Sequence, residues 1–103
     1  MDNFVIETAS GKVRGFAEDG QIAFLGIPYA MPPVGELRLK RAVPVKPWEG
    51  VLDASSYGYV CPLLDLGKPQ GEIRGPHRYW VMDEDCQNLN IWTPGCDGEK
   101  RPV

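Results

Sequence analysis

The most informative pattern in this chain is FLGIPYAMPPVGELRL, residues 24–39. The pattern begins inside an apolar run, residues 22–27, which is typical of a largely buried strand. From Pro28 onward prolines recur as far as Pro47. Proline removes a backbone donor and disfavours helix in the residue before it. The sequence therefore predicts a buried strand that gives way to an ordered surface path.

Toward the N-terminus, short apolar segments alternate with turn residues. Glycine and polar residues cluster at 9–12 and 18–21, and the segments between and beside them have the composition of strands. Three short strands joined by two tight turns form an antiparallel meander in most proteins. We therefore expect such a meander over residues 4–8, 13–17 and 22–27.

Toward the C-terminus the pattern is less regular. Residues 47–53 indicate a turn followed by a short extended piece, and residues 54–58 a helical turn with Asp53 or Ser55 as its cap. Residues 89–92 read Leu-Asn-Ile-Trp and predict a further strand. The remaining connections are expected to be polar loops.

Composition excludes several classes of protein. The 103 residues carry 11 basic and 14 acidic side chains and are 43% hydrophobic, so the chain is neither disordered nor a basic nucleic-acid binder. No apolar run is long enough to cross a bilayer. The segment 1–4 has neither the basic nor the apolar part of a signal peptide, and no N-glycosylation sequon occurs. We expect a soluble, cytoplasmic protein that binds neither nucleic acid nor membrane.

Proline and glycine point to a larger structure. Ten prolines and twelve glycines leave no clean helical stripe, and a compact domain rarely holds so much irregular backbone by itself. Residues 101–103 also resemble the start of a strand that is not completed. We therefore expect this chain to be one segment of a larger domain, with strands, ordered loops and little helix.

No complete catalytic constellation is visible. The single histidine, His77, lies among loop residues, and none of the three serines occurs in a Gly-x-Ser-x-Gly motif. The cysteines lack zinc-site spacing, and the run Asp83-Glu84-Asp85 is more typical of surface charge than of a cation site. Neither a metal nor a cofactor is expected.

Three motifs in order resemble one family. These are GKVRG at 11–15, the FLGIPYAMPPVGELRL stretch at 24–39, and EDCQNLNIWTP at 84–94. Together they resemble the N-terminal region of the type-B carboxylesterase/lipase family, the cholinesterase-like branch of the α/β-hydrolases. The resemblance covers residues 4–103.

The resemblance implies an α/β-hydrolase fold of which residues 1–103 form the N-terminal, mostly-β segment. It implies a serine carboxylic-ester hydrolase of broad small-ester specificity that works by Ser-His-acid acyl transfer. The oxyanion loop, the nucleophile elbow and the other triad members would all lie beyond residue 103, so no catalytic residue is expected here. The expected partners are the remainder of the hydrolase and a small-molecule ester.

The resemblance also gives structural roles to residues of this chain. Cys61 and Cys86 match the pair that bounds an Ω-shaped loop near the mouth of the active-site gorge, and such a pair stays reduced in a cytoplasm. Arg38 and Glu84 match an ion pair that anchors this loop, where a planar guanidinium can meet a carboxylate bidentately. The same placement puts Leu66 and Trp80, inside the loop, at the rim of the substrate pocket.

Two alternatives stay open at the level of the sequence. The first is a cholinesterase-like adhesion or binding domain without catalysis, although such proteins are mostly extracellular and glycosylated. The second is a truncated relic whose exposed sheet edge recruits a partner. The gene sequence after residue 103 separates these alternatives from an esterase.

Overall fold

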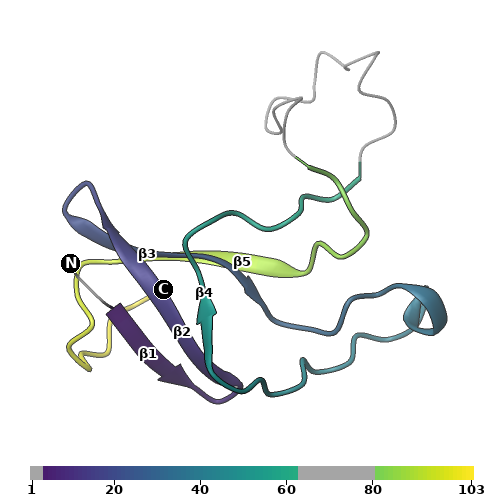
Figure 1. Ribbon diagram of the computed structural model, residues 1–103, viewed down its shortest axis with the longest axis horizontal. Helices are drawn as coiled ribbons and strands as arrows, with labels where there is room; N and C mark the ends of the chain where they lie inside the picture. Colours follow the sequence, from purple (N-terminus) through teal and green to yellow (C-terminus); the bar gives the residue numbers. More distant parts are fainter. Residues whose placement is uncertain (1–3, 63–80) are drawn as a thin grey trace, which may run out of the picture.

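The computed structural model describes residues 4–62 and 81–103. This part of the chain is a five-stranded sheet with long irregular connections and a single short 3-10 turn (Figure 1). The elements in chain order are β1 (Phe4–Thr8), β2 (Gly11–Glu18), β3 (Gln21–Pro28), η1 (Gly35–Leu37), β4 (Val51–Asp53) and β5 (Asn88–Thr93).

The predicted meander is confirmed. β1, β2 and β3 pair antiparallel in sequence order, with Ile6 opposite Val13 and Phe16 opposite Ala23. Between β2 and β3 the chain turns on two residues, Asp19 and Gly20, at φ 49° and 77°. Positive φ at both positions is the geometry whose twist matches that of the flanking strands, which explains the Asp-Gly pair.

The other two strands come from distant parts of the chain. β5, at the position of the strand predicted over 89–92, pairs antiparallel with β3. β4 lies parallel to β2, on the edge opposite β1. The β3–β5 register shifts between Phe24 and Ile27. At this irregularity Gly26 has φ 68°, and its amide donates to the Asn90 side chain instead of a strand partner, at 2.9 Å.

The sheet has two chemically different faces. Register places Phe4, Ile6, Val13, Phe24 and Ile91 on one side, which we call the inner face. The core cluster of Val13, Ile22, Phe24 and Ala54 lies on this side. The outer face carries the alternate residues, including Val5, Glu7, Lys12, Arg14, Glu18 and Trp92.

Residues 29–50 follow the irregular path that the prolines predict. This arm is closed by Ala30 opposite Pro44, with Met31 N–H donating to the Val43 carbonyl at 2.8 Å, and it contains η1. Trp48 docks the end of the arm onto the β1–β2 turn, because its ring covers Gly11 and its indole N–H donates to the Lys12 carbonyl at 2.9 Å.

Two local predictions are wrong. Residues 54–58 form no helical turn, because Ala54 is buried and its backbone donates to Arg14 and accepts from Leu25. These sheet-like bonds continue the path of β4 through Ala54, and the chain then bends at residues 55 and 56. Residues 101–103 are not in a strand, and Arg101 instead folds back to pair with Asp97.

No helix in the described part of the chain has the length and apolar character needed to cross a membrane.

Candidate functional site

The two ends of the predicted Ω-shaped loop lie side by side. Residues 60–62 and 81–86, which we call the loop base, flank the residues that the structure leaves undescribed (Figure 1). Val60 N–H donates to the Val81 carbonyl at 2.9 Å, and Asp83 N–H donates to the Val60 carbonyl at 3.1 Å. Backbone hydrogen bonds therefore close the loop base without a covalent link.

Cys61 and Cys86 sit in this loop base as free thiols. Cys61 is exposed and Cys86 is half-buried. Burial raises the pKa of the Cys86 thiol, and the neighbouring Cys61 raises this pKa further through its charge and a hydrogen bond. Since a thiolate is the reactive form of cysteine, a raised pKa makes Cys86 a poor nucleophile at neutral pH.

Arg38 and Glu84 are brought together across 46 positions of sequence. Arg38 follows η1, and its Nε donates to Glu84 Oε1 at 2.9 Å. The two side chains are 56% and 48% exposed, so water screens the pair. The pair ties the proline-rich arm to the loop base, but its exposure limits what it adds to stability.

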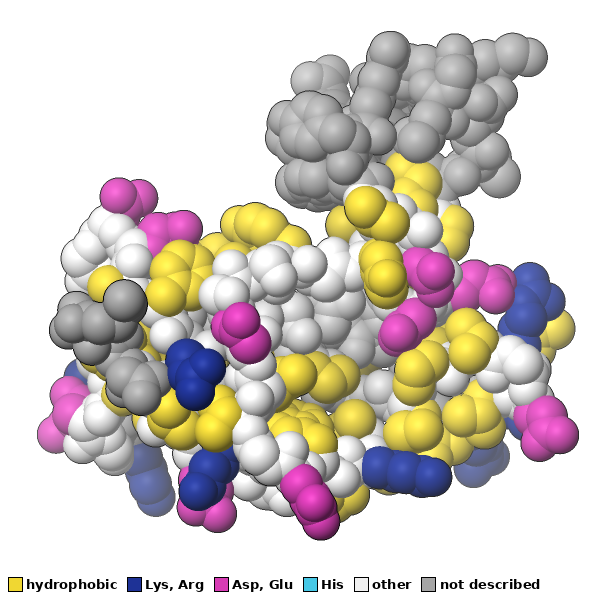
Figure 2. All heavy atoms as spheres, viewed as in Figure 1, with side chains coloured by type: hydrophobic (Ala, Val, Ile, Leu, Met, Phe, Trp, Pro, Cys, Tyr) yellow, Lys and Arg dark blue, Asp and Glu magenta, His cyan; other side chains and the backbone are white. Residues whose placement is uncertain are grey.

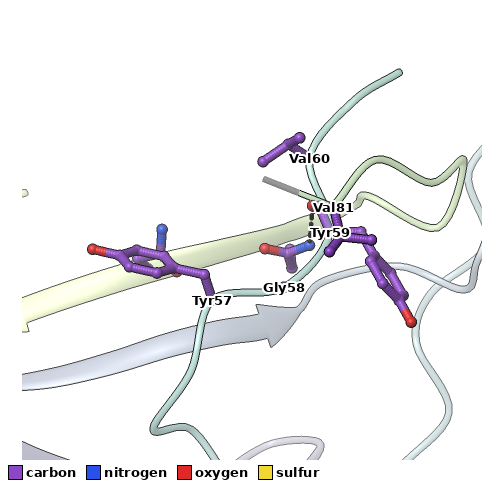
Figure 3. A pocket seen from close by; sticks show the side chains of 7 residues that line it. Tyr57, Gly58, Tyr59, Val60 and Val81 are labelled. Atoms are coloured by element: carbon purple, nitrogen blue, oxygen red, sulfur yellow. Dashed lines mark hydrogen bonds between the residues drawn. The ribbon is translucent and has the colours of Figure 1, made fainter. Parts of the chain in front are cut away.

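A hollow of about 440 Å³ lies beside the loop base. It is bounded by Tyr57–Val60, Val81 and two residues of β5, Asn88 and Asn90. The Tyr57 and Tyr59 rings extend to opposite sides of Gly58 (Figure 3). Both rings are substantially exposed, and a space of this size can accept a small organic group.

Two amides hold the wall of this hollow. Asn88 Nδ2 donates to the Tyr59 carbonyl at 3.1 Å, which Figure 3 marks with a dashed line. Asn90 Oδ1 accepts from Gly26 N–H. The sequence analysis did not predict either residue as part of a site. A signal was present, because Asn88 and Asn90 alternate with apolar residues in a strand, and this alternation places both amide side chains on the same face.

The other residues named from the sequence fall outside the described residues or lie in an exposed segment. Leu66, Trp80 and His77 fall outside the described residues. Ser55 and Ser56 are exposed in an irregular segment. Within residues 4–62 and 81–103, no three His, Cys, Asp or Glu side chains are grouped so that they could hold a metal. The described residues hold no nucleophile paired with a base.

Known proteins share this sequence and this arrangement of strands. The carboxylesterase family model matches residues 2–103. Phenmedipham hydrolase of Pseudarthrobacter oxydans is 47% identical over 100 residues, which cover 96% of this chain and 20% of that protein. Acetylcholinesterase of Bungarus fasciatus is 46% identical over 106 residues, which cover 95% of this chain and 17% of that protein.

Solved structures agree with the sequence matches. An esterase from the anaerobe Clostridium hathewayi superposes with a TM-score of 0.73 at 49% identity, over 90% of this chain and 18% of that chain. The chain spans about a fifth of the length of the curated relatives it matches. Its antiparallel strands and scarce helix correspond to an N-terminal segment of the α/β-hydrolase carboxylesterases. Sequence and fold thus agree over nearly all of its length, and this chain belongs to the carboxylesterase family.

Proposed function

We propose that these 103 residues are the N-terminal segment of a single α/β-hydrolase domain that hydrolyses small carboxylic esters by serine acyl transfer. The observation that carries the proposal is the family match over residues 2–103. Phenmedipham hydrolase, para-nitrobenzyl esterase and the Clostridium esterase, to which this chain is similar, are hydrolases by name or title.

The chemistry divides between this segment and the rest of the enzyme. Acyl transfer from an ester needs a nucleophile with a base and preorganised donors for the oxyanion. The sequence of this chain holds no nucleophile elbow, so we place the serine, histidine, acid and oxyanion donors in the rest of the domain. The segment itself contributes the loop base and the adjoining hollow, with Leu66 and Trp80 at the pocket rim.

The test uses the full product of the gene. We expect it to contain a Gly-x-Ser-x-Gly elbow and to hydrolyse p-nitrophenyl butyrate. Replacing the elbow serine by alanine is expected to lower kcat by about 10⁴-fold or more while leaving the fold intact, because the nucleophile and its base act as one unit. A full-length product that lacks the elbow, or one whose activity survives the replacement, contradicts the proposal.

We also propose that the protein works in the cytoplasm. The support comes from the sequence, which contains no N-glycosylation sequon, and in a reducing compartment Cys61 and Cys86 would stay free thiols. Rapid quenching of intact cells with an alkylating agent should label Cys61 and Cys86 as free thiols. Recovery of a Cys61–Cys86 disulfide from such cells would contradict this location.

A further inference from the structure

The hollow beside the loop base, which we call the loop-base hollow, has walls of two chemical kinds. One wall is the aromatic and aliphatic surface of residues 57–60 and Val81, and the other is the pair of amide side chains of Asn88 and Asn90. None of these lining residues, all of which the structure describes, is charged. Figure 2 shows exposed groups of hydrophobic side chains between separate acidic and basic ones. An uncharged site with apolar walls and a few polar groups suits a neutral organic ligand.

The apolar wall is open and has room for an aromatic ring. Tyr57 and Val81 are 62% and 64% exposed, and the Tyr57 and Tyr59 rings extend to opposite sides of Gly58 (Figure 3). A cavity of roughly 150 Å³ is enough to bind one benzene molecule. The loop-base hollow encloses about 440 Å³, so it can take a ring together with its substituents. Tyrosine rings are favourable partners for such a ring in offset or edge-to-face contact.

The two amides leave one acceptor and one donor free. Asn88 Nδ2 donates to the Tyr59 carbonyl at 3.1 Å, and Asn90 Oδ1 accepts from Gly26 N–H at 2.9 Å. These backbone partners fix the orientation of each amide. Within the described chain, the opposite ends, Asn88 Oδ1 and Asn90 Nδ2, make no hydrogen bond to the protein. Side chains two residues apart in a strand lie on one face, about 7 Å apart along it, so a single ligand can reach both groups.

Close packing holds this polar wall in place. A Cβ at Gly58 would lie 2.6 Å from Asn88 Nδ2, and a Cβ at Gly26 would lie 2.9 Å from the Ser56 carbonyl oxygen. The chain at residues 56–58 therefore lies directly against β3 and β5. Because the wall is formed before a ligand arrives, binding has to order little of the protein.

From these observations we propose that the loop-base hollow is a subsite for the uncharged aryl group of an ester substrate. The ring lies against Tyr57, a polar substituent on it accepts from Asn90 Nδ2, and a donor on the ligand meets Asn88 Oδ1. This inference rests on the proposed function, because it takes the aryl group to be part of the substrate. The alcohol side and the acid side of an ester can each carry such a ring, so the test compares both.

The kinetic test measures KM in the full gene product for three esters. In 4-acetamidophenyl butyrate the ring is on the alcohol side, in ethyl 4-acetamidobenzoate it is on the acid side, and butyl butyrate has no ring. We expect Tyr57→Leu to raise the ratio of KM for one of the aryl esters to KM for butyl butyrate about three- to tenfold, because a ring contact is lost. The aryl ester that shows the change identifies the side of the ester that enters the hollow.

Two variants control for effects other than the loss of the ring contact. Tyr57→Phe keeps the ring and should leave the KM ratio near that of the unmodified protein. Tyr29→Leu removes another exposed tyrosine, one that does not line the hollow, and should leave the ratio unchanged. Equal changes in KM for all three esters in Tyr57→Leu, or the same change of ratio in Tyr29→Leu, would overturn the proposal.

A binding measurement on the same protein does not depend on hydrolysis. With methyl-labelled valine, we expect 4-nitroacetanilide to shift the NMR signals of Val60 and Val81, which line the hollow, and not that of Val43 in the arm. Asn90→Asp keeps the oxygen that accepts from Gly26 and removes the amide donor, so it should weaken this binding at least about threefold. Unresponsive Val60 and Val81 signals, or binding that Asn90→Asp leaves unchanged, would overturn the proposal.

The two measurements together separate this inference from the proposed function. Shifts at Val60 and Val81 in a product that hydrolyses no ester would support the aryl site and contradict the esterase. Active enzyme whose Val60 and Val81 signals do not respond, and whose KM ratios do not depend on Tyr57, would leave the esterase in place and reject the aryl site.

Discussion

Gly15 shows how closely β2 and β3 approach each other. A Cβ at this position would lie 2.5 Å from the Ala23 carbonyl oxygen and 2.7 Å from the Phe24 ring. Both neighbours belong to the packed sheet and cannot move far. Gly15 does not have a positive φ, so its backbone conformation does not require glycine. The requirement for glycine comes instead from the close packing of its neighbours.

We expect Gly15→Ala to destabilise the protein by about 1–3 kcal/mol through overpacking. The matched control is Gly95→Ala, where the nearest atom to an added Cβ is 3.4 Å away. Urea unfolding of both variants, made in the full gene product, gives the comparison. If Gly15→Ala unfolds at the same urea concentration as Gly95→Ala, β2 and β3 do not pack as closely at Gly15 as the structure shows.

The Arg38–Glu84 pair gives a second prediction at this scale. Both side chains are about half-exposed, so Arg38→Ala should cost only about 0–1 kcal/mol. A buried pair would cost several kcal/mol, because the remaining charge would be unpaired. A double-mutant cycle with Glu84→Ala measures the coupling. A coupling above about 2 kcal/mol would show that the pair is buried in the complete enzyme.

Asp97 gives a prediction on pH. The Arg101 guanidinium, at 2.8 and 3.0 Å, together with the Glu99 amide, lowers the pKa of Asp97 from 3.8 to about 2. Because the folded value lies below the unfolded one, the interaction stabilises the fold fully above pH 3.8 and is lost as pH falls toward 2.

An NMR titration of the Asp97 carboxyl carbon checks this value directly. We expect Arg101→Gln to bring the pKa back toward 3.8, whereas Arg41→Gln should leave it near 2. An Asp97 that titrates near 3.8 in the unmodified protein would show that the pair does not form in solution.

Trp48 acts at the scale of elements, because it fixes where the arm meets the meander. Its indole N–H donates to Lys12, its backbone N–H donates to Ser10 at 2.9 Å, and its ring covers Gly11. Three residues later the chain enters β4 and pairs parallel with β2. Docking by Trp48 therefore sets the register of β4, with Val51 opposite Lys12.

Trp48→Phe keeps most of the ring and removes one hydrogen bond, so we expect a loss of about 1 kcal/mol. Trp92 also donates one indole hydrogen bond, but it is 45% exposed. Trp92→Phe should therefore stay within about 0.5 kcal/mol of the unmodified protein. Thermal unfolding of the full gene product compares the two variants, and an equal loss of stability from both would contradict the docking role of Trp48.

At the scale of the whole molecule, burial is shallow. Of the seven buried hydrophobic residues in the described chain, three are alanines. A chain of this length gains too little from burial around a single sheet to offset its conformational entropy easily. The stability of residues 1–103 therefore depends on what covers the half-exposed apolar side chains of the inner face, such as Ile6 and Ile91.

We expect the isolated chain 1–103 to unfold without a cooperative transition and to hydrolyse no aryl ester above background. Urea titration followed by tryptophan fluorescence, with hydrogen exchange on the same sample, measures the first point. Sharp two-state unfolding of a monomer would contradict it. Turnover that survives alanine at Ser10, Ser55 and Ser56 would contradict the placement of the nucleophile outside this chain.

The sequence by itself determined the meander, the irregular proline-rich arm and the family. These features depend on short-range patterns: period-two apolar positions, the Asp19-Gly20 turn, prolines that exclude helix, and motifs of contiguous residues. The prediction of a helical turn at 54–58 was wrong because the backbone of Ala54 forms hydrogen bonds with Arg14 and Leu25, which are distant in sequence. No local pattern contains that information.

Only the tertiary structure decided the parallel pairing of β4, the exposure of Arg38 and Glu84, and the hollow beside the loop base. Each depends on residues separated by dozens of positions, such as the 64 between Gly26 and Asn90. Side-chain type predicts that two groups attract each other, but their exposure sets how strongly they do so. Exposure depends on which other segments pack around them, and so it follows from the folded chain as a whole.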